Sequence, residues 1–65
     1  MKLIELTGAD DSFVCVNVDH IAAFCQFSKT TTELMVGELR YEVKQTPIEI
    51  IQKIEDVVNE KVKVL

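Results

Sequence analysis

Thr46-Pro47-Ile48-Glu49 opens the clearest structural signal in the sequence, and residues 50–63 continue it at helical spacing. The Thr46 hydroxyl can accept a hydrogen bond from the amide of Glu49, while the Glu49 carboxylate can accept one from the amide of Thr46. Pro47 suits the first helical position, where its missing N–H leaves no donor unpaired. The pattern therefore predicts a helix that begins directly after Thr46.

The predicted helix is amphipathic, because its apolar residues recur three and four positions apart. These apolar residues are Ile50, Ile51, Ile54, Val57, Val58 and Val62. The polar residues of the other side are Glu49, Gln52, Lys53, Asp56, Asn59, Glu60 and Lys63. A stripe of this kind covers a hydrophobic core, so the residues before Thr46 must supply the surface that it covers.

The chain before the helix alternates apolar and polar residues with the two-residue period of β-strands. The predicted strands are residues 2–7, 12–18, 21–27, 31–36 and 39–44. Gly37-Glu38 places glycine first in a two-residue turn, which predicts a type II′ hairpin. Ala22 and Ala23 make a helix the competing interpretation of the third segment. In the last strand, we expect Leu39, Tyr41 and Val43 to face inward.

These elements predict an α+β fold: five short antiparallel strands, which include two hairpins, followed by one C-terminal amphipathic helix. A length of 65 residues predicts a single domain over residues 1–65. A chain of this size buries only about 60% of the surface that it exposes when unfolded. Small domains compensate with disulfides, metals or oligomerisation. We therefore expect self-association, as a dimer or a larger homo-oligomer.

Charge and hydropathy argue against two classes of partner. The net charge is −4 and the seven basic residues are scattered, whereas phosphate binding requires clustered Lys and Arg. Nucleic acid is therefore disfavoured as a partner. No stretch reaches the length of apolar sequence that spans a bilayer, and the N-terminus lacks a signal-peptide pattern. We expect no membrane association and a cytoplasmic location.

The sequence predicts no metal site, no cofactor and no catalytic activity. Cys15, His20 and Cys25 have zinc-ligand chemistry, but structural zinc sites use four ligands with closely spaced cysteine pairs. Both cysteines lie in apolar, strand-like runs, so we expect reduced, buried thiols. A Cys–His nucleophile needs a third group to orient the base. Asp19 is a poor orienter, because neighbouring residues in a corner point apart.

The aromatic and large apolar residues of the strands have two interpretations. Phe13, Phe24, Phe27, Leu39 and Tyr41 exceed what one helix can cover on a five-stranded sheet, and an exposed apolar patch marks an interface. The alternative is that they complete the core. We select Phe24 and Phe27 as candidate partner contacts.

A ligand site formed at a subunit junction is a further possibility from the sequence. Its candidate residues are Arg40, Tyr41 and Lys44.

The order of these residues resembles the FlbD-like family of small flagellar-associated bacterial proteins and similar short bacterial and phage proteins. The matching residues are Ile4-x-Leu6-Thr7, Val16-Asn17, Ile21, Thr32-x-Leu34-x-Val36-Gly37, Tyr41-x-Val43-Lys44, and Thr46 before Ile50, Ile51 and Ile54. Gln45 stands where that family usually has Glu. The resemblance implies a small binding or regulatory module, with no reaction of its own.

The expected function is therefore a non-enzymatic, homo-oligomeric interaction or regulatory module, with an unknown protein partner as a further option. The alternatives are a regulator that binds nucleic acid through a local basic patch and a small-ligand binder with sites at subunit junctions. The strand-then-helix plan is similar to that of the carbon-storage-regulator RNA-binding proteins. Their Gly- and Arg-rich RNA-contacting ends are absent from this acidic sequence.

Overall fold

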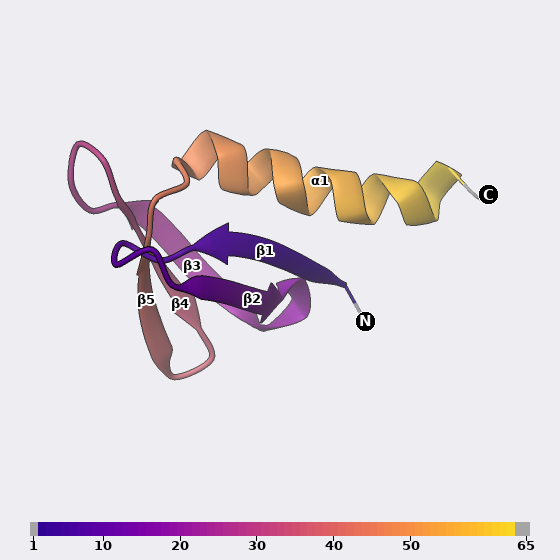
Figure 1. Ribbon diagram of the computed structural model, residues 1–65. Coiled ribbons are helices and arrows are strands. Elements are labelled where there is room, and N and C mark those ends of the chain that lie inside the picture. The colour runs from indigo at the N-terminus through magenta and orange to yellow at the C-terminus, as the bar shows by residue number, and fades with distance from the viewer. Residues whose placement is uncertain (1, 64–65) are drawn as a thin grey trace.

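A computed structural model describes residues 2–63 of the chain, with side chains described as far as Val58. The elements are β1 (Leu3–Thr7), β2 (Phe13–Asn17), a 3-10 turn η1 (Val18–His20), β3 (Ile21–Gln26), β4 (Thr32–Val36), β5 (Leu39–Val43) and α1 (Pro47–Lys63), as Figure 1 shows. All strand pairs are antiparallel. The α+β prediction is confirmed, and Ala22 and Ala23 lie in a strand rather than a helix.

The strands form two sheets instead of the single five-stranded sheet that we expected. β1 and β2 form a hairpin, and β3, β4 and β5 form a second sheet in that order. The break falls at η1, where the Asn17 side chain accepts a hydrogen bond from the Asp19 amide at 2.9 Å and holds the corner. This corner turns β3 away from β2, so the two strands do not pair.

The two sheets are joined where β1 ends and β5 ends. Gly8 and Val43 form an isolated antiparallel bridge. On either side of it, the Lys44 amide donates to the Thr7 carbonyl at 2.7 Å and the Ala9 amide donates to the Glu42 carbonyl at 2.8 Å. The inner faces of the sheets can therefore close on one core.

The β4–β5 hairpin follows the predicted turn chemistry. Gly37 has a φ of +60°, a conformation that glycine adopts without strain, and it occupies the first central position of the turn. Val36 pairs with Leu39 directly behind it. The two-residue turn thus fixes the register of both strands.

The helix begins as predicted, and both halves of its capping box are present. The Glu49 amide donates to Thr46 Oγ1 at 3.1 Å, and the Thr46 amide donates to Glu49 Oε1 at 2.8 Å. Ile50 is fully buried, and Ile54 and Val57 pack against the core.

Two residues of the predicted apolar stripe have other outcomes. Ile51 is 44% exposed, because it lies on one flank of the stripe rather than at its centre. The Val62 side chain lies outside the described residues.

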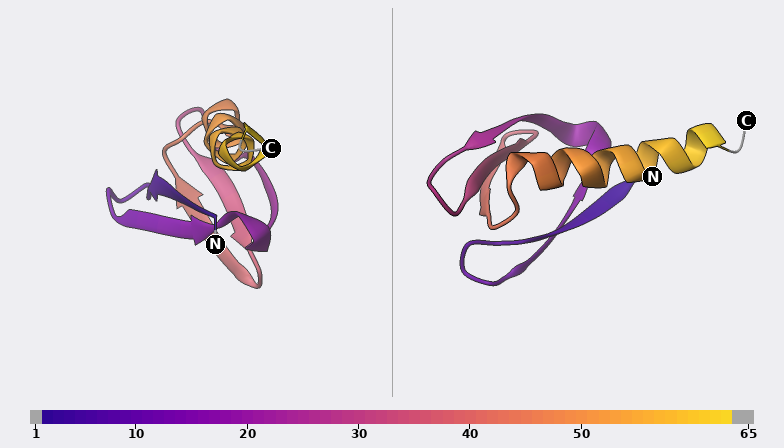
Figure 2. Two further views of the ribbon diagram at one scale, coloured as in Figure 1. Left: turned by 90° about the vertical axis from the view of Figure 1, so that its right-hand side faces the viewer. Right: turned by 90° about the horizontal axis from the view of Figure 1, so that it is seen from above.

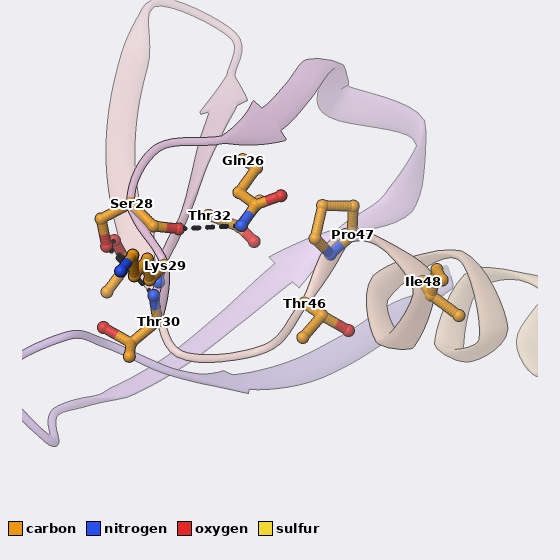
Figure 3. A pocket seen from close by; sticks show the side chains of 9 residues that line it. Gln26, Ser28, Lys29, Thr30, Thr32, Thr46, Pro47 and Ile48 are labelled. Carbon is orange, nitrogen blue, oxygen red and sulfur yellow. Dashed lines mark hydrogen bonds between the residues drawn. The ribbon is translucent and has the colours of Figure 1, made fainter.

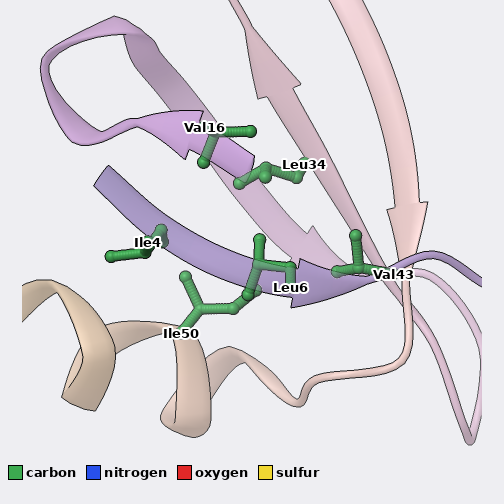
Figure 4. Close-up of a cluster of buried hydrophobic side chains, with 6 residues drawn as sticks. All are labelled: Ile4, Leu6, Val16, Leu34, Val43 and Ile50. Carbon is green, nitrogen blue, oxygen red and sulfur yellow. The ribbon is translucent and has the colours of Figure 1, made fainter. Parts of the chain in front are cut away.

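Six buried apolar residues from both sheets and the helix make the core. They are Ile4, Leu6, Val16, Leu34, Val43 and Ile50, and Figure 4 shows them converging between the strands and α1. Figure 2 shows the helix lying over the opening between the β1–β2 hairpin and the three-stranded sheet, and it contacts β1 and β3. One helix therefore closes one side of a small core.

Because each sheet buries only its inner face, residues of the outer faces remain accessible. Cys15 and Cys25 are both exposed, so the prediction of buried thiols was wrong. They alternate with the inward-facing Val16 and Phe24, and no second layer covers their side of either sheet in the described part of the chain. Leu39 is 61% exposed, although it was predicted to face inward, because it lies at the end of β5 farthest from the core residue Val43.

Candidate functional site

Arg40 and Tyr41, two of the predicted ligand contacts, lie beside one shallow hollow. It has a volume of about 360 Å³, and its other lining residues are Gly8, Ala9, Asp10, Ser12, Val14 and Glu42. Tyr41 is half-buried against the core, while Arg40 is exposed with its Nε 3.7 Å from Glu33 Oε2. Asp10 is held by hydrogen bonds from Ser12, which lower the pKa of its carboxyl.

The third predicted contact, Lys44, does not line this hollow. Its ammonium group forms an ion pair with the Asp11 carboxylate. The hollow instead combines the Arg40 guanidinium with the carboxylates of Asp10 and Glu42. The predicted cationic cluster at the junction is therefore only partly assembled, and its charges are already neutralised by nearby acids.

Phe24 and Phe27, the predicted partner contacts, differ in their surroundings. Phe24 faces inward on β3, opposite Leu34, and packs against the core. Phe27 follows the last residue of β3 and is 61% exposed. The two interpretations of the aromatic residues thus divide between them: Phe24 completes the core, whereas Phe27 stays available.

A second cavity lies where the loop between β3 and β4 approaches the first turn of α1 (Figure 3). Its volume is about 310 Å³, and its lining residues are Gln26, Ser28, Lys29, Thr30, Thr31, Thr32, Thr46, Pro47 and Ile48. Ser28 Oγ lies 2.6 Å from Thr31 Oγ1 and accepts from the Thr31 amide at 3.1 Å. The Gln26 side-chain amide donates to the Ser28 carbonyl at 3.1 Å. The loop therefore satisfies many of its own polar groups.

Thr32, at the base of this cavity, is the exception. The residue is only 1% exposed, and its hydroxyl finds no hydrogen-bond partner among the described residues. A buried polar group without a partner is rare and calls for a water molecule or a ligand. Sequence reasoning assigned this threonine to a strand start only, because the cavity arises from a helix 14 or more positions away in the chain.

The residues with metal-ligand chemistry do not converge. Cys15 lies on the outer face of β2, Cys25 on the outer face of β3, and His20 in the exposed turn η1. Within residues 2–63, no three His, Cys, Asp or Glu side chains come close enough to hold a metal ion.

Large apolar side chains are exposed over much of the described surface. Seven of them are between 38% and 70% exposed: Leu3, Phe13, Phe27, Met35, Leu39, Ile48 and Ile51. They equal or outnumber the buried apolar residues of the core.

One surface combines exposed apolar side chains with unpaired backbone. β3 is at the edge of its sheet, and α1 contacts it on the inner face. On the other flank of α1, Lys53 and Asp56 lie beside Leu3 and Glu5 of β1. Helical geometry places Ile51 and Val58 on the opposite flank, which is the one toward β3. We call the open edge of β3 together with this flank the β3–α1 surface.

The described helix is neither long nor apolar enough to cross a bilayer. The chain matches no family model, no curated protein and no solved structure.

Proposed function

We propose that this protein is a non-enzymatic interaction module that acts as a homo-oligomer. The observation that carries the proposal is the set of seven exposed large apolar side chains on a domain with only six buried ones. Single exposed apolar residues are normal on a monomer, but a small domain rarely leaves this much of its apolar content in water. Association with another copy would remove part of this surface from solvent.

The total surface of the chain supports the same proposal. The accessible surface is 4784 Å², whereas a compact monomer of 7.4 kDa exposes about 4200 Å². Part of the excess comes from α1, whose last turns extend past the strands (Figures 1 and 2). A stable dimer buries about 800 Å² on each partner. The excess surface is of the order that one such interface would cover.

The charge distribution favours a protein partner over nucleic acid. Arg40 and Lys44, the two basic residues of β5 and its end, form ion pairs with Glu33 and Asp11. With a net charge of −4, little positive potential is left for a phosphate backbone. The resemblance to the FlbD-like family supports the same class of function, a small binding or regulatory module.

The proposal predicts that stability rises with protein concentration, because association favours the folded state by mass action. Thermal unfolding followed by circular dichroism over a hundredfold range of concentration tests this. An increase of the melting temperature with concentration supports a homo-oligomer. A constant melting temperature over the whole range contradicts it.

A second candidate function, small-ligand binding, rests on one observation, the unpartnered Thr32 hydroxyl in the cavity beside α1. The cavity is at the lower end of the size range of ligand pockets. Native mass spectrometry of the protein as purified from cells tests it, with Thr32→Val as the matched variant. A bound small molecule present on the wild type and lost from Thr32→Val supports this function, and an empty wild-type protein contradicts it.

A further inference from the structure

We infer that two copies of this chain associate through β3, which pairs antiparallel with β3 of the second copy around a two-fold axis at Cys25. The inference rests on the proposed self-association and adds the surface, the register and the residues. It places Phe27 and the Ile51 flank of α1 at the interface.

The backbone of β3 is prepared for a partner strand on one side. The Phe27 amide donates to the Thr31 carbonyl at 3.0 Å, which sets the phase of the β3–β4 ladder. Because hydrogen-bonded positions alternate in antiparallel pairs, Ala23 and Cys25 direct their N–H and C=O groups toward β4. Phe24 and Gln26 direct theirs to the open edge. Such an edge is a template for another strand.

The positions of these groups select one register. Pairing Phe24 with Gln26 of the second copy, and Gln26 with its Phe24, satisfies the outward N–H and C=O groups of both residues in each copy. This arrangement also avoids the irregularity between Ile21 and Ala23, where the ladder of β3 with β4 shifts register. Symmetry then puts Cys25 directly opposite Cys25 of the second copy, at a position where Cα atoms lie about 4.5 Å apart.

The side chains fit this register on both faces of the joined sheet. On the outer face, Ala23 lies opposite the exposed Phe27 of the second copy, so a large apolar ring meets a small residue. On the inner face, the two helices lie on the same side of the sheet, each beside its own β3. Their facing flanks carry Ile51, which is 44% exposed, and the half-buried Val58. The pairing would therefore remove Phe27 and Ile51 from water together.

Charge at the strand ends distinguishes β3 from β2, the other open edge. Antiparallel pairing brings the start of one strand next to the end of its partner. For β3 this places the exposed Asp19 near the exposed Lys29 of the second copy, which is a favourable approach. For β2 it would place Asp10 and Asp11 near Asp19, and like charges oppose association. No charged residue interrupts Ile21–Gln26 itself.

The native cysteines supply the test, because both are exposed and each lies at the outer face of an edge strand. Dilute protein is treated with diamide, which accepts two hydrogens as two thiols join in a disulfide, and the products are separated on a non-reducing gel. Opposed Cys25 residues are within disulfide distance in the inferred register. We expect a covalent dimer with the wild type and with Cys15→Ser, and at least a tenfold smaller yield with Cys25→Ser.

A charge placed at the axis gives a second readout. Cys25→Lys sets two ammonium groups opposite each other, whereas Cys15→Lys makes the same exchange at an exposed site of β2. Both side chains point to solvent, so both variants should fold with unchanged circular dichroism. We expect Cys25→Lys to sediment as a monomer at concentrations where Cys15→Lys remains a dimer.

The outcomes separate this inference from the proposed function. A wild-type dimer that Cys25→Lys leaves intact, or that cross-links through Cys15 as readily as through Cys25, overturns the β3 pairing and leaves self-association standing. A wild type that is monomeric throughout overturns both.

Discussion

The side-chain carbonyl of Gln45 accepts a hydrogen bond from the Thr7 amide at 2.9 Å, across 38 positions of sequence. The Gln45 amide nitrogen also lies 3.4 Å from Thr7 Oγ1. Because the Thr7 carbonyl accepts from the Lys44 amide, a single segment just before α1 satisfies both backbone groups of Thr7. The end of β1 is thereby fixed to the residues that lead into the helix.

Replacing Gln45 with Ala should lower the free energy of unfolding by about 1–2 kcal/mol, because the half-buried Thr7 amide loses its acceptor. Gln45→Glu is the control, since a carboxylate still accepts from that amide and loses only the weak contact with the Thr7 hydroxyl. Urea unfolding measures both. Equal losses for the two variants would show that the hydrogen bond to the Thr7 amide is not the stabilising contact.

The capping box predicts unequal effects at its two ends. Thr46→Ala should cost about 1 kcal/mol of unfolding free energy, the usual loss for an N-cap residue. Glu49→Ala should cost less, because it leaves unpaired only the exposed Thr46 amide, which water can reach. Urea melts of both variants check the order. Negligible effects from both would mean that these hydrogen bonds do not hold the start of α1.

Two isoleucines of α1 should respond differently to the same charge. Ile54→Asp introduces an unpaired carboxylate against the core and should cost about 3 kcal/mol or more, enough to unfold much of a small domain. Ile51→Asp sits on the exposed flank and should leave circular dichroism and monomer folding intact while it weakens association. A folded Ile54→Asp protein would show that the helix turns a different face to the core.

Thr32→Val tests the orphan hydroxyl independently of any ligand. The exchange keeps the shape of the side chain and removes a buried polar atom that has no partner in the described structure. We expect the unfolding free energy to stay constant or to rise by about 1 kcal/mol. Thr31→Val is the contrast, because Thr31 Oγ1 bonds to Ser28 Oγ and its loss should destabilise the loop. A clear loss of stability in Thr32→Val would reveal a hydrogen bond to this hydroxyl.

Features set by short-range chemistry could be predicted from the sequence. The start of α1 depends on Thr46 and Glu49, which are three residues apart, and the β4–β5 turn depends on Gly37 alone. Residue alternation placed the strands to within one or two positions of their observed ends.

Features set by distant contacts could not be predicted. The division into two sheets depends on the contact of Gly8 with Val43, and this contact also decides which face of each strand is buried. The exposure of Cys25 follows from that choice. The cavity at Thr32 exists only because the first turn of α1 returns to the β3–β4 loop. The resemblance to the FlbD-like family stays a prediction.

Sedimentation equilibrium over a dilution series from high to low micromolar concentration tests self-association most directly. The account predicts a wild-type mass that approaches twice the 7.4 kDa of the monomer and falls toward it on dilution. A single species at the monomer mass over the whole series, with seven large apolar side chains still in water, would contradict it.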